Sequence, residues 1–292
     1  MKIAAIADIH GNYQALITIL DHIDRWNPDL VLVLGDIVNR GPRSRECLHL
    51  LQERERNQGW HLIKGNHEGY VLKFQDPAFL RSGPEFEIQR VIYWTYQTLS
   101  ENELIYLENL PEKLSLDLDN GQVVRAFHAS TAGDRIGIYP RSTEDELIQK
   151  VDLESDLFLV GHTHQPLIRP FRDMIISNVG SVGLPFDGDK RAAYAQFTYN
   201  IDQWTGNIIR LEYDLSAAAR DYQETGFILE GGPMAEMILA ELKLGWPQLL
   251  SWFKRYESNV LAGQISLEKA VKEFLINPNI EQPRNDISMS YP

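Results

Sequence analysis

Short apolar runs that end abruptly in polar residues recur through the first two thirds of the chain. They span residues 3–7, 30–34, 60–64, 123–127 and 157–160. Runs of this length and composition are typical of buried strands. Each run is followed directly by Gly, Asp or His. The pattern therefore predicts that polar side chains gather at the carboxyl ends of the strands.

The segment between the first two runs has a helical pattern. Tyr13, Leu16, Ile17 and Leu20 recur at helical spacing, and Asn12 is suited to cap the amino terminus of the helix. Strand and helix therefore alternate at the start of the chain, which predicts an α/β fold. In such folds, ligands bind at the carboxyl ends of the strands.

More helices and a second sheet are predicted farther along. Residues 84–110 follow a mostly helical pattern that Pro111 ends, and we interpret them as an insertion between strands. Apolar strands resume at residues 174–176, 192–199 and 207–213, and they predict a second sheet.

After Ser216 the pattern is helical to about residue 275, so we interpret residues 216–292 as a helical C-terminal extension. Trp246, Leu249, Leu250 and Phe253 have helical spacing after Pro247, which is suited to a first helical turn. We expect this helix to pack on the preceding domain; the alternatives are that it caps the functional site or forms a homo-oligomer. The last stretch contains Pro278, Pro283 and Pro292 and is predicted to be an exposed tail.

Composition and charge restrict the class of protein. Of the 292 residues, 43% are hydrophobic and 24% are charged, values close to globular averages that indicate a folded protein. The 28 Lys and Arg against 41 Asp and Glu give a net charge of −13, and this field repels polyanions. No substantial basic run offsets it, so nucleic-acid binding, and with it a nuclease, is disfavoured.

The single cysteine and the apolar segments indicate a location. Cys47 cannot form an intrachain disulfide, as expected of a protein in a reducing compartment. The amino-terminal apolar run is five residues long, too short for the core of a signal peptide, and no segment approaches a membrane span. We therefore expect a cytoplasmic protein without membrane partners.

Two pairs of polar residues have the spacing of ligands to one ion. Asp8 and His10 are two residues apart, so in an extended backbone their side chains project to the same side. His162 and His164 repeat this spacing. Each pair alone is weak evidence, because such pairs also occur in ordinary loops.

The joint pattern is stronger. Five of the eight histidines, two aspartates and one asparagine follow the predicted strands: Asp8, His10, Asp36, Asn66, His67, His128, His162 and His164. Imidazole, carboxylate and amide ligands suit Mn²⁺, Fe or Zn²⁺, whereas the lack of thiolates argues against structural zinc or an iron–sulfur cluster. A carboxylate such as Asp36 can bridge two ions.

These motifs resemble those of a known family. Asp8-x-His10, Gly35-Asp36, Gly65-Asn66-His67-Glu68, His128 and Gly161-His162-x-His164 occur in the order found in calcineurin-like metallophosphoesterases, over roughly residues 1–215. The segment from Asn178 to Arg191 is similar to bacterial small phosphodiesterases and phosphatases. The segment from Gly35 to Gly41 and the Glu after His67 are similar to serine/threonine protein phosphatases and diadenosine tetraphosphatases.

The resemblance implies a fold and a metal centre. The implied fold is a layered α/β/β/α sandwich of two facing mixed sheets, with residues 1–215 as the catalytic domain. The resemblance assigns Asp8, His10, Asp36 and His164 to one divalent metal ion. It assigns Asp36, Asn66, His128 and His162 to the other. We expect Mn²⁺ first, with Fe or Zn²⁺ as alternatives. The implied activity is hydrolysis of a phosphate ester by metal-activated hydroxide.

Three further residues are given roles by the resemblance. His67 would protonate the leaving oxygen, because an imidazolium titrates near the working pH. Arg40 would contact phosphate oxygens through its planar fork, and Asn66 would also contact the substrate. The residue before Arg40 is Asn39, where protein phosphatases usually have Asp. An amide supplies no charge to His67, so we expect His67 to be a weaker acid and activated phosphodiesters to be favoured.

The remaining chemistry-bearing side chains are expected to be structural. His22, His49 and His61 match no motif position, and Cys47 is expected to pack in a helix. Arg43, Arg45, Lys190 and Arg191 flank the predicted site and are candidates for recognising an anionic substrate, against the alternative that they are ordinary surface residues.

Two other classes of function remain alternatives. One is a non-catalytic, metal-binding interaction module of the same fold, and the other is the disfavoured nuclease. The substrate stays open between nucleotides, other small phosphate esters and phosphoproteins, because loops set specificity in such sites.

Overall fold

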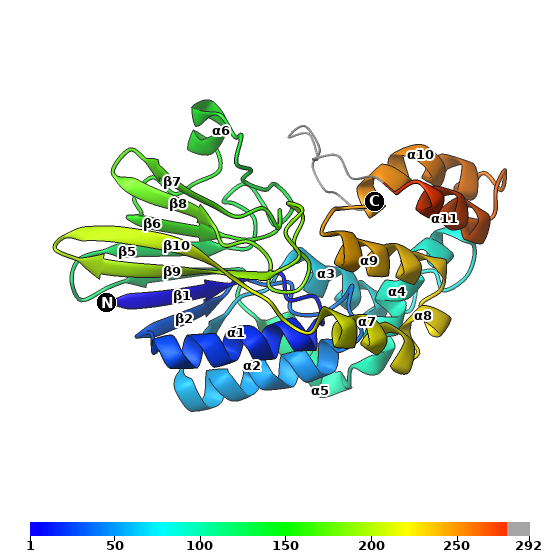
Figure 1. Ribbon diagram of the computed structural model, residues 1–292, viewed down its shortest axis with the longest axis horizontal. Coiled ribbons are helices and arrows are strands. Elements are labelled where there is room, and N and C mark those ends of the chain that lie inside the picture. The colour runs from blue at the N-terminus through cyan, green and yellow to red at the C-terminus, as the bar shows by residue number, and fades with distance from the viewer. Residues whose placement is uncertain (279–292) are drawn as a thin grey trace.

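The computed structural model describes residues 1–278, and two five-stranded sheets form its centre (Figure 1). The first sheet has the order β10-β9-β1-β2-β3. Its strands are β1 (Lys2–Ile6), β2 (Leu30–Val33), β3 (His61–Leu62), β9 (Ala192–Asn200) and β10 (Gln203–Leu211). Strands β1, β2 and β3 are parallel to one another, and β9 is antiparallel to both β1 and β10.

The second sheet has the order β4-β5-β6-β8-β7. Its strands are β4 (Lys113–Asp117), β5 (Val123–Phe127), β6 (Leu157–Val160), β7 (Leu167–Phe171) and β8 (Met174–Asn178). The pairs β5–β6 and β6–β8 are parallel, and the two edge strands are antiparallel to their neighbours. Both sheets are therefore mixed, as expected from the sequence.

Helices cover the outer faces of the sheets and form one end of the molecule. They are α1 (Tyr13–Trp26), α2 (Ser44–Gln58), α3 (Asn66–Leu72), η1 (Lys73–Gln75), α4 (Pro84–Thr98), α5 (Glu101–Asn109), α6 (Glu144–Ile148), α7 (Leu215–Glu224), α8 (Phe227–Glu230), α9 (Pro233–Leu244), α10 (Leu249–Leu261) and α11 (Leu267–Ile276). Figure 1 shows α1 and α2 against the first sheet and α6 beyond the second.

Alternating side chains divide the core into layers. Ile3 and Ala5 of β1 point between the sheets, where they meet Leu159 of β6. Ala4 and Ile6, the intervening residues, face α1 and α2 instead. On the far side of the second sheet, Phe158 and Val160 pack on the loop and helix around α6. This alternation confirms the predicted α/β/β/α sandwich, because strands buried on both faces must send successive side chains into different layers.

The sequence pattern located most elements but misassigned the second sheet. Residues 192–200 and 203–211 extend the first sheet, since β9 pairs with β1, and only β8 of the three resumed strands joins the second. Strands β4 and β7 were not predicted. Both are edge strands, and Pro170 in β7 and the exposed alternate residues of β4 weaken the apolar pattern.

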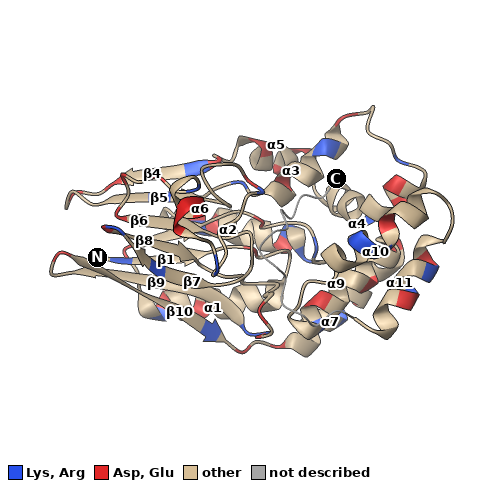
Figure 2. Cartoon of the chain, turned by 90° about the horizontal axis from the view of Figure 1, so that it is seen from above, with Lys and Arg blue, Asp and Glu red and all other residues tan. Residues whose placement is uncertain are grey.

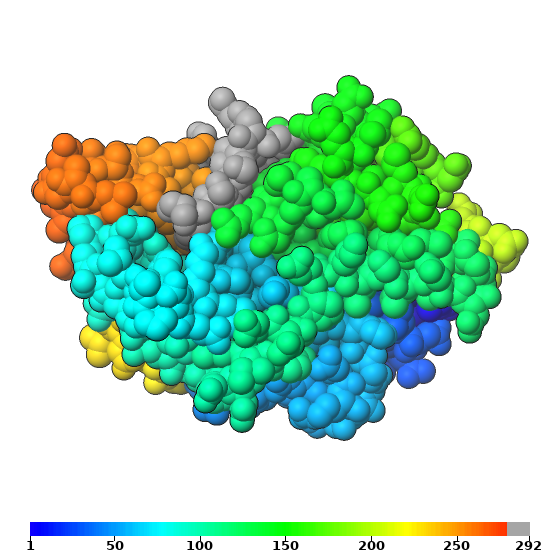
Figure 3. Space-filling view, turned by 180° about the vertical axis from the view of Figure 1, so that it is seen from behind, coloured from blue at the N-terminus to red at the C-terminus, as the bar shows by residue number. Residues whose placement is uncertain are grey.

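Helices α4 and α5 occupy the predicted segment 84–110, and helices continue from α7 to α11 as expected. Figure 3 shows the cyan α4 region beside the orange helices α10 and α11 at one end of the molecule, where these helices are in contact. Leu249 and Trp252 of α10 are buried there in the same core as α1 and α2.

The C-terminal extension differs from the predicted one in where helix α10 begins, and part of its predicted tail lies outside residues 1–278. Helix α10 begins at Leu249, so Pro247 precedes the helix and Trp246 lies outside it. The backbone N–H groups of Gln248 and Leu249 both donate to the Glu241 side chain, which determines this start. The predicted tail prolines Pro283 and Pro292 lie outside the described residues.

Residues of both charge signs occur together on the outer helices (Figure 2). Figure 2 shows both signs interspersed on outer helices such as α11, where Glu268 pairs with Lys272. Within residues 1–278, none of the helices is both long enough and apolar enough to cross a bilayer.

Candidate metal centre

Polar side chains from five separated segments meet where the strands of both sheets end. Asp8 follows β1, Asp36 follows β2, and Asn66 follows β3. From the second sheet, His128 follows β5, and His162 and His164 follow β6. All of these side chains and that of His10 are buried. The seven residues therefore converge as the sequence pattern predicted.

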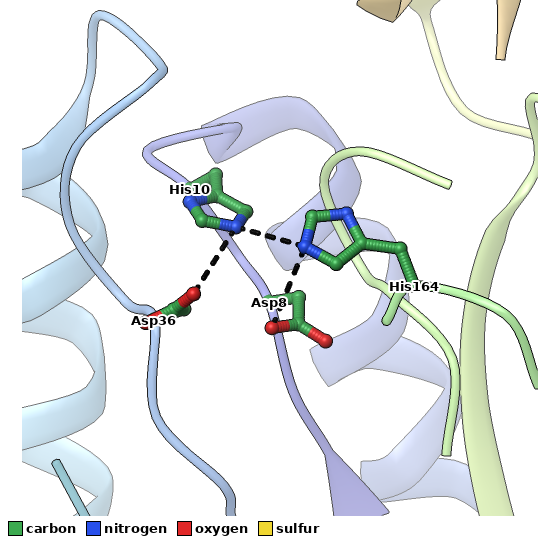
Figure 4. A group of neighbouring side chains, drawn as sticks. All are labelled: Asp8, His10, Asp36 and His164. Atoms are coloured by element: carbon green, nitrogen blue, oxygen red, sulfur yellow. Dashed lines mark hydrogen bonds and ion pairs between the residues drawn. The ribbon is translucent and has the colours of Figure 1, made fainter. Parts of the chain in front are cut away.

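The first donor group consists of Asp8, His10, Asp36 and His164, whose ligand atoms all lie within 4.8 Å of one another. Figure 4 shows the four side chains pointing toward one another from three loops. His10 Nε2 lies 3.2 Å from His164 Nε2 and 3.5 Å from Asp36 Oδ2. Asp8 Oδ1 lies 3.6 Å from His164 Nε2.

The second donor group consists of Asp36, Asn66, His128 and His162. Asp36 Oδ2 lies 3.3 Å from His128 Nε2. Asn66 Oδ1 lies 2.8 Å from His128 Nε2 and 2.9 Å from His162 Nδ1. The same oxygen of Asp36 thus faces both groups, because it also approaches His10 in the first.

Two imidazole rings are oriented by hydrogen bonds to backbone carbonyls. His128 Nδ1 donates to the carbonyl of Leu34 over 2.7 Å, and His164 Nδ1 donates to the carbonyl of Leu184. When each ring is neutral, a proton on Nδ1 leaves the Nε2 lone pair directed at the donor group. Such carbonyl partners set the tautomer of histidines that bind metals.

The backbone of the site differs from the expected extended conformation. Asp8 and His10 have φ angles of 55° and 48°, and His162 and His164 have 68° and 55°. These residues are in the left-handed region, because the chain must turn sharply where each strand ends. The two-residue spacing still brings the two side chains of each pair together, although both residues have a left-handed backbone conformation and not an extended one. Non-glycine residues in this region cost on the order of 1–3 kcal/mol each and cluster at functional sites.

The residues present fit a pair of divalent cations. Asp8 Oδ1 is buried and makes no hydrogen bond within the described residues. His10 Nε2 and His164 Nε2 are directed at each other, a juxtaposition that a cation between them would favour. Buried carboxylate, imidazole and amide donors without thiolate suit Mn²⁺, Fe or Zn²⁺.

The charge of the site is concentrated on the Asp36–His128 pair. Burial opposes ionisation of Asp36, but the positive charge of His128 lowers the pKa of this carboxyl well below its ordinary value. Burial likewise disfavours protonation of His128, yet Asp36 raises its pKa to about 10. Asp36 is therefore the carboxylate that stays ionised at neutral pH.

His67 lies at the edge of the first donor group. Its ring centroid is 4.7 Å from that of His10. The resemblance implies that His67 titrates near the working pH, whereas burial lowers the pKa of this ring to about 3. Asn39 Nδ2 lies 2.8 Å from His67 Nδ1, while Asn39 Oδ1 accepts from the Arg40 backbone N–H over 2.8 Å. The Arg40 N–H thereby orients the amide so that Asn39 donates to His67, and the neutral ring carries its proton on Nε2.

Arg40 lies on the same side of the site. Its side chain is buried and forms an ion pair with Glu241 at 3.1 Å. The guanidinium also lies 5.8 Å from the Phe186 ring centroid, and Phe186 stacks on His164 with centroids 4.3 Å apart.

Glu68 supports the candidate site, and the sequence interpretation gave it no role. Its carboxylate is fully buried and accepts four backbone N–H groups, from Asp36, Ile37, Val38 and Gly65, over 2.7–3.1 Å. It therefore ties the loop that carries Asp36 to the start of α3. Its place at the third position of α3, after Gly65, is the capping-box spacing that could have indicated this role.

The other histidines and the cysteine lie away from the two donor groups. His22 contacts the Tyr194 hydroxyl, and His49 pairs with Glu103 on the helical face. His61 lies within β3, and Cys47 is buried in α2, where burial raises its thiol pKa.

The flanking arginines, which the sequence offered as candidates for substrate recognition, have carboxylate partners of their own. Arg43 pairs with Asp221 and Glu46. Arg45 pairs with Glu103, and Arg191 with Asp189, while Lys190 is exposed.

The fold and the site together define a class of protein. Two facing mixed sheets with buried oxygen and nitrogen donors at their strand ends are typical of metal-dependent hydrolases that act through paired ions. The chain belongs to the calcineurin-like phosphoesterase family, whose model matches residues 1–206. Members of this family use a dinuclear metal site. The match ends before α7, so helices α7–α11 lie beyond it.

Individual relatives agree with this membership. The chain is 28% identical over 195 residues to serine/threonine-protein phosphatase 2 of Escherichia coli, covering 60% of this chain and 86% of that protein. It is 27% identical over 231 residues to an uncharacterized protein of Methanocaldococcus jannaschii, covering 74% and 89%. Among solved structures, the metallophosphoesterase from Sphaerobacter thermophilus is similar with a TM-score of 0.65 and 29% identity, covering 84% of this chain and 99% of that one.

Proposed function

We propose that this protein is a phosphoesterase that hydrolyses a phosphodiester or phosphomonoester with two divalent metal ions. The observation that carries the proposal is the position of Asp36 Oδ2, which lies 3.5 Å from His10 Nε2 and 3.3 Å from His128 Nε2. One carboxylate oxygen shared by two donor groups is the arrangement that a bridging ligand requires.

In this proposal, Asp8, His10, Asp36 and His164 hold one ion, and Asp36, Asn66, His128 and His162 hold the other. Such a pair would supply hydroxide at neutral pH and would stabilise charge on the attacking and leaving oxygens. Mn²⁺ is our first expectation, and Fe or Zn²⁺ suit the same donors.

Three side chains act on the substrate in this proposal. The Nε2–H group of His67 would donate a hydrogen bond to the leaving oxygen and stabilise the charge that develops there, because Asn39 holds Nδ1 as the acceptor. Arg40 contacts phosphoryl oxygens through guanidinium N–H groups, and the Asn66 amide contacts the substrate as well. The substrate we envisage is a small phosphate ester in the cytoplasm, since a single cysteine suits a reducing compartment.

A metal-binding module without activity is the second candidate, and the presence of His67 beside the donor groups favours the enzyme. The nuclease alternative has no support from a chain in which acidic residues outnumber basic ones, 41 to 28.

The test is a screen of phosphomonoesters and phosphodiesters after reconstitution with Mn²⁺, Fe²⁺ or Zn²⁺. We expect turnover by the wild type, loss of at least about a hundredfold in Asp36→Asn, and a smaller loss in His67→Ala. His22→Ala, which removes an imidazole outside the site, is the matched control and should retain activity. Inactivity of the wild type with every metal, or equal losses in His67→Ala and His22→Ala, would contradict the proposal.

A further inference from the structure

Helices beyond the family match contact the loop that carries Arg40. The Tyr222 hydroxyl of α7 donates to the carbonyl of Arg40 over 3.2 Å. Asp221 accepts from Arg43 at 2.8 Å. Glu241 of α9 pairs with the Arg40 guanidinium itself. Figure 1 shows α7 and α9 beside the end of the sheets where the donor groups lie. The extension is therefore part of the surroundings of the site.

The Glu241 carboxylate is held in one position. Its side chain is 1% exposed, and Oε2 lies 3.1 Å from Arg40 Nη1. Oε1 accepts the backbone N–H groups of Gln248 and Leu249 over 2.7 and 2.9 Å. Burial raises the pKa of this carboxyl, while Arg40 and the two N–H donors act in the opposite direction and favour the ionised form. A fixed negative charge thus lies against Arg40.

Arg40 in turn lies beside the first donor group. Its contact with Phe186, which stacks on His164, places the guanidinium at the border of the first donor group. The positive charge of Arg40 therefore lies close to the place where a phosphoryl group would bind.

We propose that Glu241 is a specificity-determining residue, which offsets the charge of Arg40 and thereby favours monoanionic phosphodiesters over dianionic phosphomonoesters. This inference rests on the proposed function. Arg40 alone would offer a full positive charge, and a phosphomonoester, which carries nearly two negative charges at neutral pH, would gain the most from it. Paired with Glu241 in a buried site, Arg40 offers little net charge. The second charge of a monoester is then poorly compensated.

The readout is a ratio that a purely structural defect leaves unchanged. The catalytic efficiency, kcat/KM, is measured with Mn²⁺ for p-nitrophenyl phosphate and for bis(p-nitrophenyl) phosphate, which share a leaving group. In Glu241→Gln we expect the monoester-to-diester ratio to rise about tenfold, because a full charge is uncovered at short range in a low-dielectric site. Glutamine keeps an acceptor for the N–H groups of Gln248 and Leu249.

A double variant separates the charge effect from a displacement of the loop. Arg40→Gln combined with Glu241→Gln removes both charges, so we expect its ratio to return to near the wild-type value even though both efficiencies fall. Glu103→Gln is the matched control, because Glu103 is also a buried carboxylate paired with an arginine, Arg45, outside the site. Its ratio should equal that of the wild type.

The outcomes are distinct. An active wild type with an unchanged ratio in folded Glu241→Gln overturns this inference alone, as does a shift that persists in the double variant. Inactivity of the wild type toward both esters overturns the proposed function and this inference together. If Glu241→Gln does not fold, Arg40→Gln alone should shift the ratio toward the diester, and the absence of that shift overturns the inference.

Discussion

Oδ2 of Asp8 accepts a hydrogen bond of 2.9 Å from the backbone N–H of His162. Asp8 follows a strand of the first sheet and His162 follows a strand of the second. A single side chain therefore joins the two sheets at the candidate metal centre, and the spacing of the sheets determines the spacing of the donors.

Gly161 is the residue that permits this approach. A Cβ at Gly161 would lie 2.5 Å from the Ala7 Cβ and 2.9 Å from Asp8 Oδ2. We expect Gly161→Ala to lower the free energy of unfolding by about 1–3 kcal/mol through overpacking and to weaken metal binding. Urea denaturation and titration with Mn²⁺ measure the two effects. Gly69→Ala is the control, because nothing lies within 4 Å of its added Cβ and the position is helical. Wild-type metal affinity in Gly161→Ala would show that the sheet spacing does not set the donor geometry.

Asn39 determines which nitrogen of His67 accepts a hydrogen bond. An aspartate at this position would accept a hydrogen bond from Nδ1–H instead of donating one. Its negative charge would raise the pKa of His67 and favour the imidazolium, which can protonate a leaving oxygen. In Asn39→Asp we expect hydrolysis of alkyl esters to increase relative to aryl esters by about tenfold, since poor leaving groups need more protonation. Steady-state kinetics with matched alkyl and aryl phosphates measure the ratio. An equal effect on both kinds of leaving group would refute the role given to His67.

Glu68 stabilises the Asp36 loop through a charged acceptor. In Glu68→Gln the amide NH₂ faces backbone N–H donors, so two hydrogen bonds to a charged group are lost and donors remain unpaired. We expect the free energy of unfolding to fall by about 3 kcal/mol, measured by urea denaturation. Glu146→Gln changes an exposed capping-box glutamate at the start of α6 and should cost less than about 1 kcal/mol. Equal losses in the two variants would be inconsistent with a special role for Glu68.

Ionised Glu103 makes a contribution to the free energy of unfolding that is lost at acid pH. Burial opposes its ionisation, but hydrogen bonds from Ser100 and Arg45 lower its pKa from 4.5 to about 2. A depressed carboxyl pKa stabilises the fold above pH 4.5, and this contribution is lost as the pH falls toward 2. The contribution is about 1 kcal/mol, because Arg45 and His49 are each 52% exposed and solvent screens their charges. Urea midpoints of the wild type and Glu103→Gln should converge as the pH falls from 5 to about 2; a constant difference would contradict this.

The sequence by itself determined most strands, the helices and the set of candidate donors. Strand β5 and the helix cap at Asn12 lie where the pattern placed them. Donors such as His128 could be identified because each directly follows a buried strand, and parallel strands bring their carboxyl ends to one edge. The periodicity of apolar residues and the position of strand ends are local properties, so they can be predicted from the sequence alone.

Only the tertiary structure decided which strands pair, how the backbone turns after each strand and which buried glutamates contact the residues of the site. An apolar run indicates a strand but not its neighbour, and so β9 was assigned to the wrong sheet. The left-handed backbone at Asp8 and His10 depends on the turn between sheet and helix. The capping-box spacing of Glu68 indicates its bond to Gly65, but only the fold brings the Ile37 N–H to Glu68 and Arg40 to Glu241. Such contacts join distant segments, and no local pattern encodes a partner that only packing supplies.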